Sequence, residues 1–190
     1  MKILGVDSTA TAASAAIYAD GKLLAVDFSN TGLTHSQTLL PMIDNVLKTA
    51  RLSVSDIDYF AVSNGPGSFT GVRIAVTIAK TIAYALSIPI RTIDALTILA
   101  LGVEGDRKIV SLEDRNGAFV GVFNSNYNVI EPLQYMNKSC YNEFKLCNNV
   151  NTNVDINYEN VYQYVMSLKE LNPHEVKPLY IKGISAIDGK

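Results

Sequence analysis

A strand, a glycine-rich loop and a long helix follow one another between residues 57 and 87, and this order constrains the fold more than any other feature. The run IDYFAVS (57–63) is apolar enough for a buried strand, and NGPGSFTGVR (64–73) contains three glycines and a proline. A helical pattern then extends to residue 87 and leads into another strand candidate, 88–93. Because such a helix forms a crossover between strands, the two strands are expected to be parallel neighbours.

The chain before this unit predicts antiparallel strands instead. Three short strand candidates open it, and the pair Asp20-Gly21 between the second and the third is typical of a hairpin turn. The resulting order, β-β-β-α-β-α-β-α, predicts an α/β fold in which a mixed sheet carries helices on its faces. The expected strands are 2–7, 12–19, 22–28, 57–63 and 88–93, and the expected helices are 35–50, 71–87 and 95–101.

The same pattern begins again after residue 104. KIVSLED (108–114) ends in acidic residues as KILGVD (2–7) does, and a second hairpin follows it at 118–135. An internal duplication of a βββαβα unit explains this similarity. The second copy is polar and rich in asparagine, with one short helix expected at 160–171 and the extended run PLYIKG after it. We therefore predict two domains, residues 1–104 and a reduced second domain at 105–190.

A duplicated βββαβα unit with an aspartate at the end of its first strand is the layout of the actin/Hsp70-like ATPases (ASKHA, RNase H-like fold). Four stretches also resemble the TsaB (YeaZ) family. They are GVDSTATAASAAI, HSQTLLPMID, SNGPGSFTGVRIAVTIAKTIAYALSIP and LEDRNG. The resemblance is strong over residues 1–125, although EDRNG (113–117) departs from the Asp-x-Arg-Arg-Gly pattern that is usual in the family.

The resemblance implies a cytoplasmic, non-catalytic subunit of the bacterial system that makes threonylcarbamoyl-adenosine in tRNA. The modified adenosine lies beside the anticodon of tRNAs that read codons beginning with A. Such a subunit binds and supports a TsaD-like subunit, which transfers the threonylcarbamoyl group, and a TsaE-like ATPase assists. The resemblance further implies a homodimer when the chain is alone, contact with tRNA only within the complex, no membrane, and no cofactor in this chain. ATP or ADP and metal are expected in the partner subunits.

The candidates for nucleotide contact lie at two loops. ATPases of this superfold carry Asp-x-Gly in the first hairpin, because glycine lets backbone amides approach phosphate. This chain has Asp7-Ser8-Thr9 instead, and Gly67 and Ser68 stand at the start of the long helix, where free amides favour anions. The alternative is structural: Asp7 caps a turn, Gly67 turns the chain, and Ser68 or Thr70 caps the helix.

Other catalytic chemistry finds little support in the residues. The two histidines, His35 and His174, do not form the pair at spacing four that a zinc hydrolase places on one helix. No G-x-S-x-G elbow occurs, and the net charge of −2 offers no basic footprint for nucleic acid. We assign no catalytic residue and no metal ligand. An ATP-binding kinase-like enzyme and a glycoprotease-like peptidase using Ser68 or His35 remain as alternatives.

The helix 71–87 suggests a contact surface for a partner. Its polar residues form one narrow stripe, and a helix that lies on one sheet needs only one of the two apolar faces that remain. The other face would then bind a partner helix, unless the chain itself buries both. With Arg73 and Lys80 inside it, the helix lacks the roughly 18 uncharged residues of a membrane span. The predicted partner surface comprises Leu39, Met42, Val46, Val72, Arg73, Val76, Ala79, Lys80 and Ala83.

Overall fold

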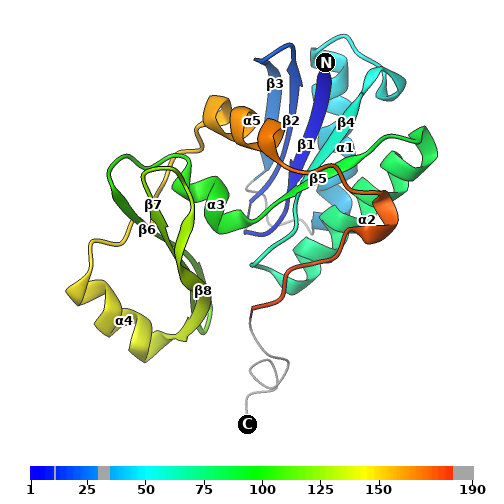
Figure 1. Ribbon diagram of the computed structural model, residues 1–190. Helices are drawn as coiled ribbons and strands as arrows, with labels where there is room; N and C mark the ends of the chain where they lie inside the picture. Colours follow the sequence, from blue (N-terminus) through cyan, green and yellow to red (C-terminus); the bar gives the residue numbers. More distant parts are fainter. Residues whose placement is uncertain (11, 30–34, 182–190) are drawn as a thin grey trace.

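The computed structural model describes residues 1–10, 12–29 and 35–181, with only the backbone of residues 35 and 36. The chain forms two lobes, each built on one sheet, with α3 between them (Figure 1). The first sheet has the strand order β3-β2-β1-β4-β5, and the second has the order β6-β7-β8. The strands are β1 (Lys2–Asp7), β2 (Ala13–Ala19), β3 (Lys22–Ser29), β4 (Tyr59–Ser63), β5 (Ile90–Ile93), β6 (Arg107–Asp114), β7 (Gly117–Asn124) and β8 (Val129–Asn137).

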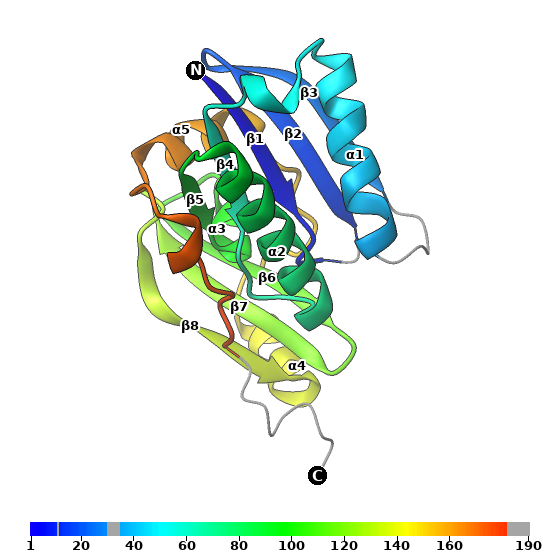
Figure 2. The same cartoon turned by 90° about the vertical axis from the view of Figure 1, so that its right-hand side faces the viewer.

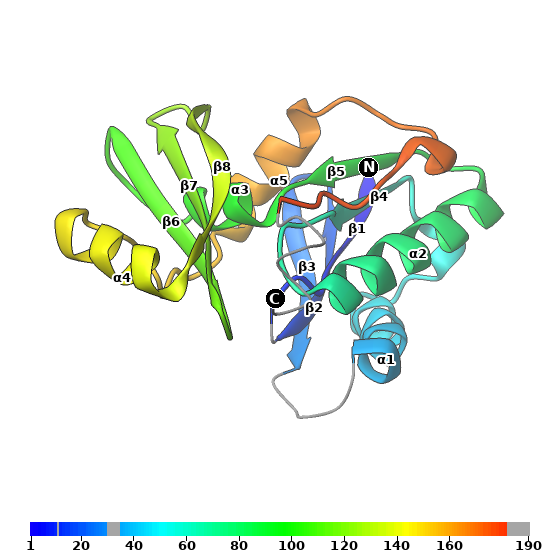
Figure 3. The same ribbon diagram turned by 90° about the horizontal axis from the view of Figure 1, so that it is seen from below.

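The first sheet is mixed, as the sequence predicts. β2 pairs antiparallel with β1 and with β3, whereas β4 runs parallel to β1 and to β5. The crossover helices α1 (His35–Thr49) and α2 (Phe69–Leu86) both cover one face of this sheet (Figures 2 and 3). Leu39 of α1, Val76 of α2 and Val62 of β4 belong to the core between them.

The opposite face, which we call the inner face, is covered by α3 (Ala95–Ala100) and α5 (Tyr158–Ser167). Arg91 of β5 fixes the end of α5. Its guanidinium is buried and donates from Nη1 to the carbonyls of Val165 (3.1 Å) and Met166 (2.7 Å). Its Nη2 also pairs with Glu170 at 2.9 Å. The helix expected at 160–171 thus begins at 158, ends at 167, and packs on the first sheet.

Residues 171–181 form a segment, here called the C-terminal strap, that also returns to the first lobe (Figures 1 and 3). Leu171 makes an antiparallel bridge to Ile90, and the short 3₁₀ helix η2 (Pro173–Glu175) packs on α2. Further along, the Leu179 N–H donates to the carbonyl of Asn64 at 2.6 Å. The division into 1–104 and 105–190 stays a prediction, but the hydrogen bonds given above tie α5 and the strap to the first lobe.

The second lobe is a three-stranded sheet with β7 in the centre. Phe119 and Phe123 pack toward α3, whereas Val120 packs toward Tyr141 of α4 (Lys138–Cys147). α4 was not expected, because its sequence is polar. Within residues 138–181 no full strand follows α4, and the place that β4 takes beside β1 is held by a single parallel bridge between Val110 of β6 and Asn151.

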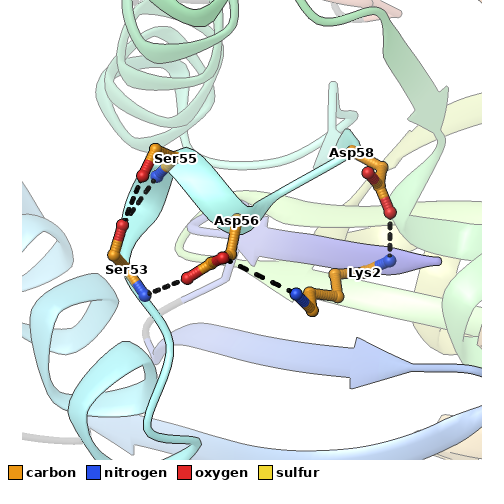
Figure 4. Close-up of polar contacts among 5 residues, drawn as sticks. All are labelled: Lys2, Ser53, Ser55, Asp56 and Asp58. Carbon is orange, nitrogen blue, oxygen red and sulfur yellow. Dashed lines mark hydrogen bonds and ion pairs between the residues drawn. The ribbon is translucent and has the colours of Figure 1, made fainter.

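The end of the first sheet remote from the glycine loop is fixed by polar contacts around η1 (Val54–Asp56) (Figure 4). The backbone N–H of Lys2 donates to Asp58 Oδ2 at 2.7 Å, and its ammonium lies 3.7 Å from Asp56 Oδ1. Asp56 Oδ2 also accepts the Ser53 N–H at 2.8 Å, which completes a capping box. These contacts are exposed and contribute little energy, but they fix the start of β1 beside the loop that leads to β4.

Among the described helices, α2 alone is long and apolar enough to cross a membrane by length and composition, with Arg73 and Lys80 inside it. A third of this 18-residue helix is buried within the protein. Its buried residues, Gly71, Val72, Ala75, Val76, Ala79 and Ala83, face α1 and the sheet. Core helices of folded proteins show this same pattern.

Candidate functional site

The glycine loop lies directly against the turn that follows β1. The Ser68 N–H donates to the carbonyl of Thr9 at 2.7 Å. Gly67 has φ +153°, and a Cβ built on it would lie 2.2 Å from that same carbonyl oxygen. Glycine is therefore required at position 67, because any side chain would push the two loops apart.

The turn itself uses its polar groups internally. Ser8 Oγ donates to the carbonyl of Gly71 at 2.7 Å, and the Thr9 N–H donates to Asp7 Oδ1 at 2.8 Å. Ser8 and Thr9 are buried. Ser68 acts as the N-cap of α2, with its Oγ accepting the Gly71 N–H at 3.1 Å.

The structure therefore brings together all five candidates for nucleotide contact, although they lie in two distant parts of the sequence. These residues are Asp7, Ser8, Thr9, Gly67 and Ser68. Thr9 contacts the glycine loop directly, and the cap and turn contacts are those of the structural alternative. A role in nucleotide binding stays a prediction.

The predicted partner surface needs correction, because most of it is core. One apolar face of α2 is buried inside the chain against α1 and the sheet, whereas the face with Ile74 and Ile78 is only half-buried. Val76 is 4% exposed, so it contacts other parts of the same chain. Arg73 is exposed and Lys80 is half-buried. The buried members of the predicted set are Leu39, Met42, Val46, Val72, Val76, Ala79 and Ala83.

The polar stripe of α2 binds the C-terminal strap. Arg73 Nε donates to the hydroxyl of Tyr180 at 2.7 Å, and Lys80 Nζ donates to the carbonyl of Val176 at 3.1 Å. The ring of Tyr84 meets that of His174 edge-on at 5.2 Å. The stripe was visible in the sequence, but its partner was not, since the strap lies about a hundred residues further along the chain.

An apolar surface does remain on the outer side of α2. Ile74 and Ile78 are only half-buried, and Leu40 of α1 and Phe69 at the start of α2 are 51% and 42% exposed. Exposed apolar patches of this kind mark contact sites. A groove of about 460 Å³ runs along this surface, which we call the outer groove, and is lined by Leu40, Phe69, Thr70, Arg73, Ile74, Thr77 and Ile78.

The strap borders the outer groove. The ring of Tyr180 packs on that of Phe69 with centroids 5.3 Å apart, and the guanidinium of Arg73 lies 3.8 Å over the Phe69 ring. Phe69 and Arg73 line the groove. The position of these two side chains therefore depends on the strap.

A further polar cluster, which sequence reasoning did not single out, ties α4 to β6. Tyr141 donates its hydroxyl to Glu113 Oε1 (3.0 Å) and lies 2.7 Å from Ser111 Oγ, while Lys145 Nζ donates to Glu113 at 3.1 Å. The hydrogen bond from Lys145 lowers the pKa of Glu113, and burial raises the pKa of Tyr141. Glu113 therefore stays charged and Tyr141 neutral, as in a structural link. Within the described part of the chain, no group of three or more His, Cys, Asp or Glu side chains has the arrangement of a metal site.

A protein-family model matches residues 29–151 and describes TsaD: tRNA N6-adenosine threonylcarbamoyltransferase. The tRNA threonylcarbamoyladenosine biosynthesis protein TsaB of Escherichia coli (strain K12) is 38% identical over 102 residues, which are 54% of this chain and 44% of that protein. TsaB of Bacillus subtilis (strain 168) is 31% identical over 136 residues, 70% of this chain and 59% of that protein. The chain thus spans about half the length of the curated relatives it matches.

Among solved structures, YeaZ from Pseudomonas aeruginosa superposes with a TM-score of 0.79 at 20% identity, covering 94% of this chain and 100% of that one. At this identity the likeness concerns the fold alone. The prediction of a mixed α/β fold of the actin/Hsp70-like, RNase H-like class is confirmed.

Proposed function

We propose that this chain, which belongs to the TsaB family and matches the TsaD family model, is a non-catalytic subunit of a tRNA threonylcarbamoyladenosine-modifying complex. In this role it binds and supports a TsaD-like subunit, which transfers the threonylcarbamoyl group to adenosine. The modified adenosine lies beside the anticodon of tRNAs that read codons beginning with A.

The observation that carries this proposal is the outer groove. Its isoleucines leave part of their apolar surface in water, and the exposed Thr70 and Thr77 lie beside them along the groove. Burying such a surface against another helix contributes roughly 25 cal/mol per Å² of apolar area before the cost of association. Arg73 at its rim offers a charged contact that would orient a partner.

The loops favour support over catalysis. Thr9 and Ser68, which a kinase-like site would aim at phosphate, hydrogen-bond to each other through their backbones. The peptidase alternative gains nothing from Ser68 either, since its hydroxyl accepts a hydrogen bond as the cap of α2. Neither alternative is favoured.

The remaining parts of the proposal follow from the family. A TsaE-like ATPase would join the complex, and tRNA would be contacted only by the assembled surface. Alone, the chain would pair with itself through the same outer groove. Nucleotide and metal would be held by the partner subunits, and the complex would work in the cytoplasm.

The test is co-purification of the chain with the TsaD-like protein of the same organism, measured by size-exclusion chromatography with light scattering. Ile78→Glu places a charge in the outer groove at a half-buried position, so the chain should fold while the complex is lost. Val76→Glu is not suitable for this purpose, because its side chain is in the core and the variant should unfold.

Ala85→Glu serves as the matched control, since Ala85 is exposed on the same helix and lies outside the groove. It should leave the complex intact. A complex that survives Ile78→Glu with unchanged affinity would refute the groove as the contact site. If the wild-type chain forms no complex with the TsaD-like protein, the proposed function fails.

A further inference from the structure

We propose that a cavity between the inner face of the first sheet and α5 binds a small ligand with an apolar body and a cationic or hydrogen-bond-donating head. The cavity is separate from the outer groove, because α1 and α2 lie on the other face of the sheet. This proposal goes beyond the proposed function and does not depend on it.

The cavity exists because small residues form its floor. Gly5 of β1, Ala16 of β2 and Ala61 of β4 leave space that Val161 and Val165 of α5 do not fill. Its volume is about 60 Å³. Since one water needs about 10–15 Å³ on this scale, the space suits a ligand of roughly four to six heavy atoms.

One end of this apolar cavity is polar. Asp7 at the end of β1 pairs with Ser14 of β2. On the other side of β1, Val6 pairs with Val62 of the parallel strand β4, and Ser63 is the next residue of β4. These three side chains therefore come from adjacent strands, at the carboxyl ends of β1 and β4, and all three line the cavity. Ligands of open α/β sheets bind at this end of the strands.

The buried hydroxyl of Ser63 lacks a hydrogen-bond partner in the described part of the chain. Ser63 is 1% exposed. A buried hydroxyl without a partner is costly, and native structures rarely keep one. A ligand with a polar head would supply the partner at the polar end of the cavity.

Charge selects the kind of head. Among the described residues that line the cavity, Asp7 is the single charged one and none is basic. Burial, followed by the nearby Asp7, raises the pKa of Tyr158, so this lining residue stays a neutral phenol. A carboxylate or phosphate would be repelled by Asp7, whereas an ammonium or hydroxyl head would be stabilised.

The probes are isobutylamine, isobutanol and isobutyrate, which share one branched body and differ in the head. Each is titrated into the isolated chain while amide shifts are followed by ¹H–¹⁵N NMR. Isobutylamine should shift the amides of Gly5, Ala16 and Ala61 in a saturable way, isobutanol should bind more weakly, and isobutyrate should bind more than about tenfold more weakly than the amine.

Two variants test the location. Gly5→Ala adds a methyl to the cavity floor, and its Cβ would meet only Ala16 O at 3.8 Å, so the fold should tolerate it. It should weaken the binding of isobutylamine by at least about fourfold, which corresponds to the free energy of burying one methylene group. Ser63→Ala removes the unpaired hydroxyl and should weaken isobutylamine about two- to tenfold without destabilising the chain.

The proposal is overturned if isobutyrate binds as tightly as isobutylamine, or if both variants bind the amine like the wild type. It is equally overturned if the amine shifts amides outside the cavity lining or shifts none. None of these results bears on the complex with a TsaD-like protein, which is measured separately through the outer groove.

Discussion

Gly67→Ala tests the claim that the glycine loop and the turn after β1 are pressed together. The substitution meets two obstacles, which are the φ of +153° and the carbonyl oxygen of Thr9, 2.2 Å from the new Cβ. The first costs about 1–3 kcal/mol of backbone strain. The second forces the loops apart, which removes the hydrogen bond between Ser68 N–H and Thr9 O.

The two contributions can be separated with Gly105→Ala. Gly105 also has a positive φ, +112°, but a Cβ built there has no atom within 4 Å. This control should lose only the stability that the backbone strain costs. The lost hydrogen bond, about 0.5–1.5 kcal/mol, and the disturbed packing of Thr9, about 1–3 kcal/mol, should appear in Gly67→Ala alone. The expected difference is therefore about 1.5–4.5 kcal/mol of unfolding free energy.

Urea unfolding followed by circular dichroism measures this difference, and thermal unfolding checks it. For a chain of this length each kcal/mol lowers the Tm by about 2–4 °C, so the Tm of Gly67→Ala should lie about 3–18 °C below that of Gly105→Ala. Equal losses in the two variants would refute the reasoning, because they would mean that Thr9 and Gly67 do not touch in solution.

Two further predictions concern other links in the fold. Arg91→Met should lower the unfolding free energy by about 2–3 kcal/mol, because the last carbonyls of α5 lose a charged donor; a loss below about 1 kcal/mol in urea unfolding would contradict this. Lys145→Met should raise the pKa of Glu113 toward its ordinary value, as followed by ¹³C NMR, and an unchanged pKa would show that the hydrogen bond is absent in solution. Since the fold lowers that pKa, the stabilisation from Glu113 is present above the ordinary pKa and is lost as the pH falls through the folded value.

Local patterns were sufficient to predict the strands and the crossover helices. β1 occurs at 2–7 as expected, because a short apolar run is a local signal, and so is the turn Asp20-Gly21 between β2 and β3. α4 was missed, although Asn137 caps it and Tyr141 and Phe144 form a short apolar stripe on it. A two-residue stripe in an asparagine-rich segment is too weak a signal to outweigh its polar composition.

The candidate site could be predicted only in part, since burial depends on segments far away in the sequence. The two loops were identified from their residue types, but their mutual contact requires the three-dimensional fold. Val76 and Ile78 are both apolar residues of α2. Only the packing of α1 in the folded chain buries Val76 in the core while Ile78 stays half-buried at the surface. Likewise, nothing near Lys80 in the sequence indicates that it donates to Val176.

The return of α5 and the strap to the first lobe has a consequence for synthesis on the ribosome. β5 is complete at residue 93, but the segments that cover its face and edge end at residue 181. At about 5–20 residues per second, these roughly 90 residues take some 5–18 seconds to make. During that interval the apolar surface around Ile3 and Ala16 has only the short α3 as native cover, so a nascent chain halted in this window would be a substrate for chaperones.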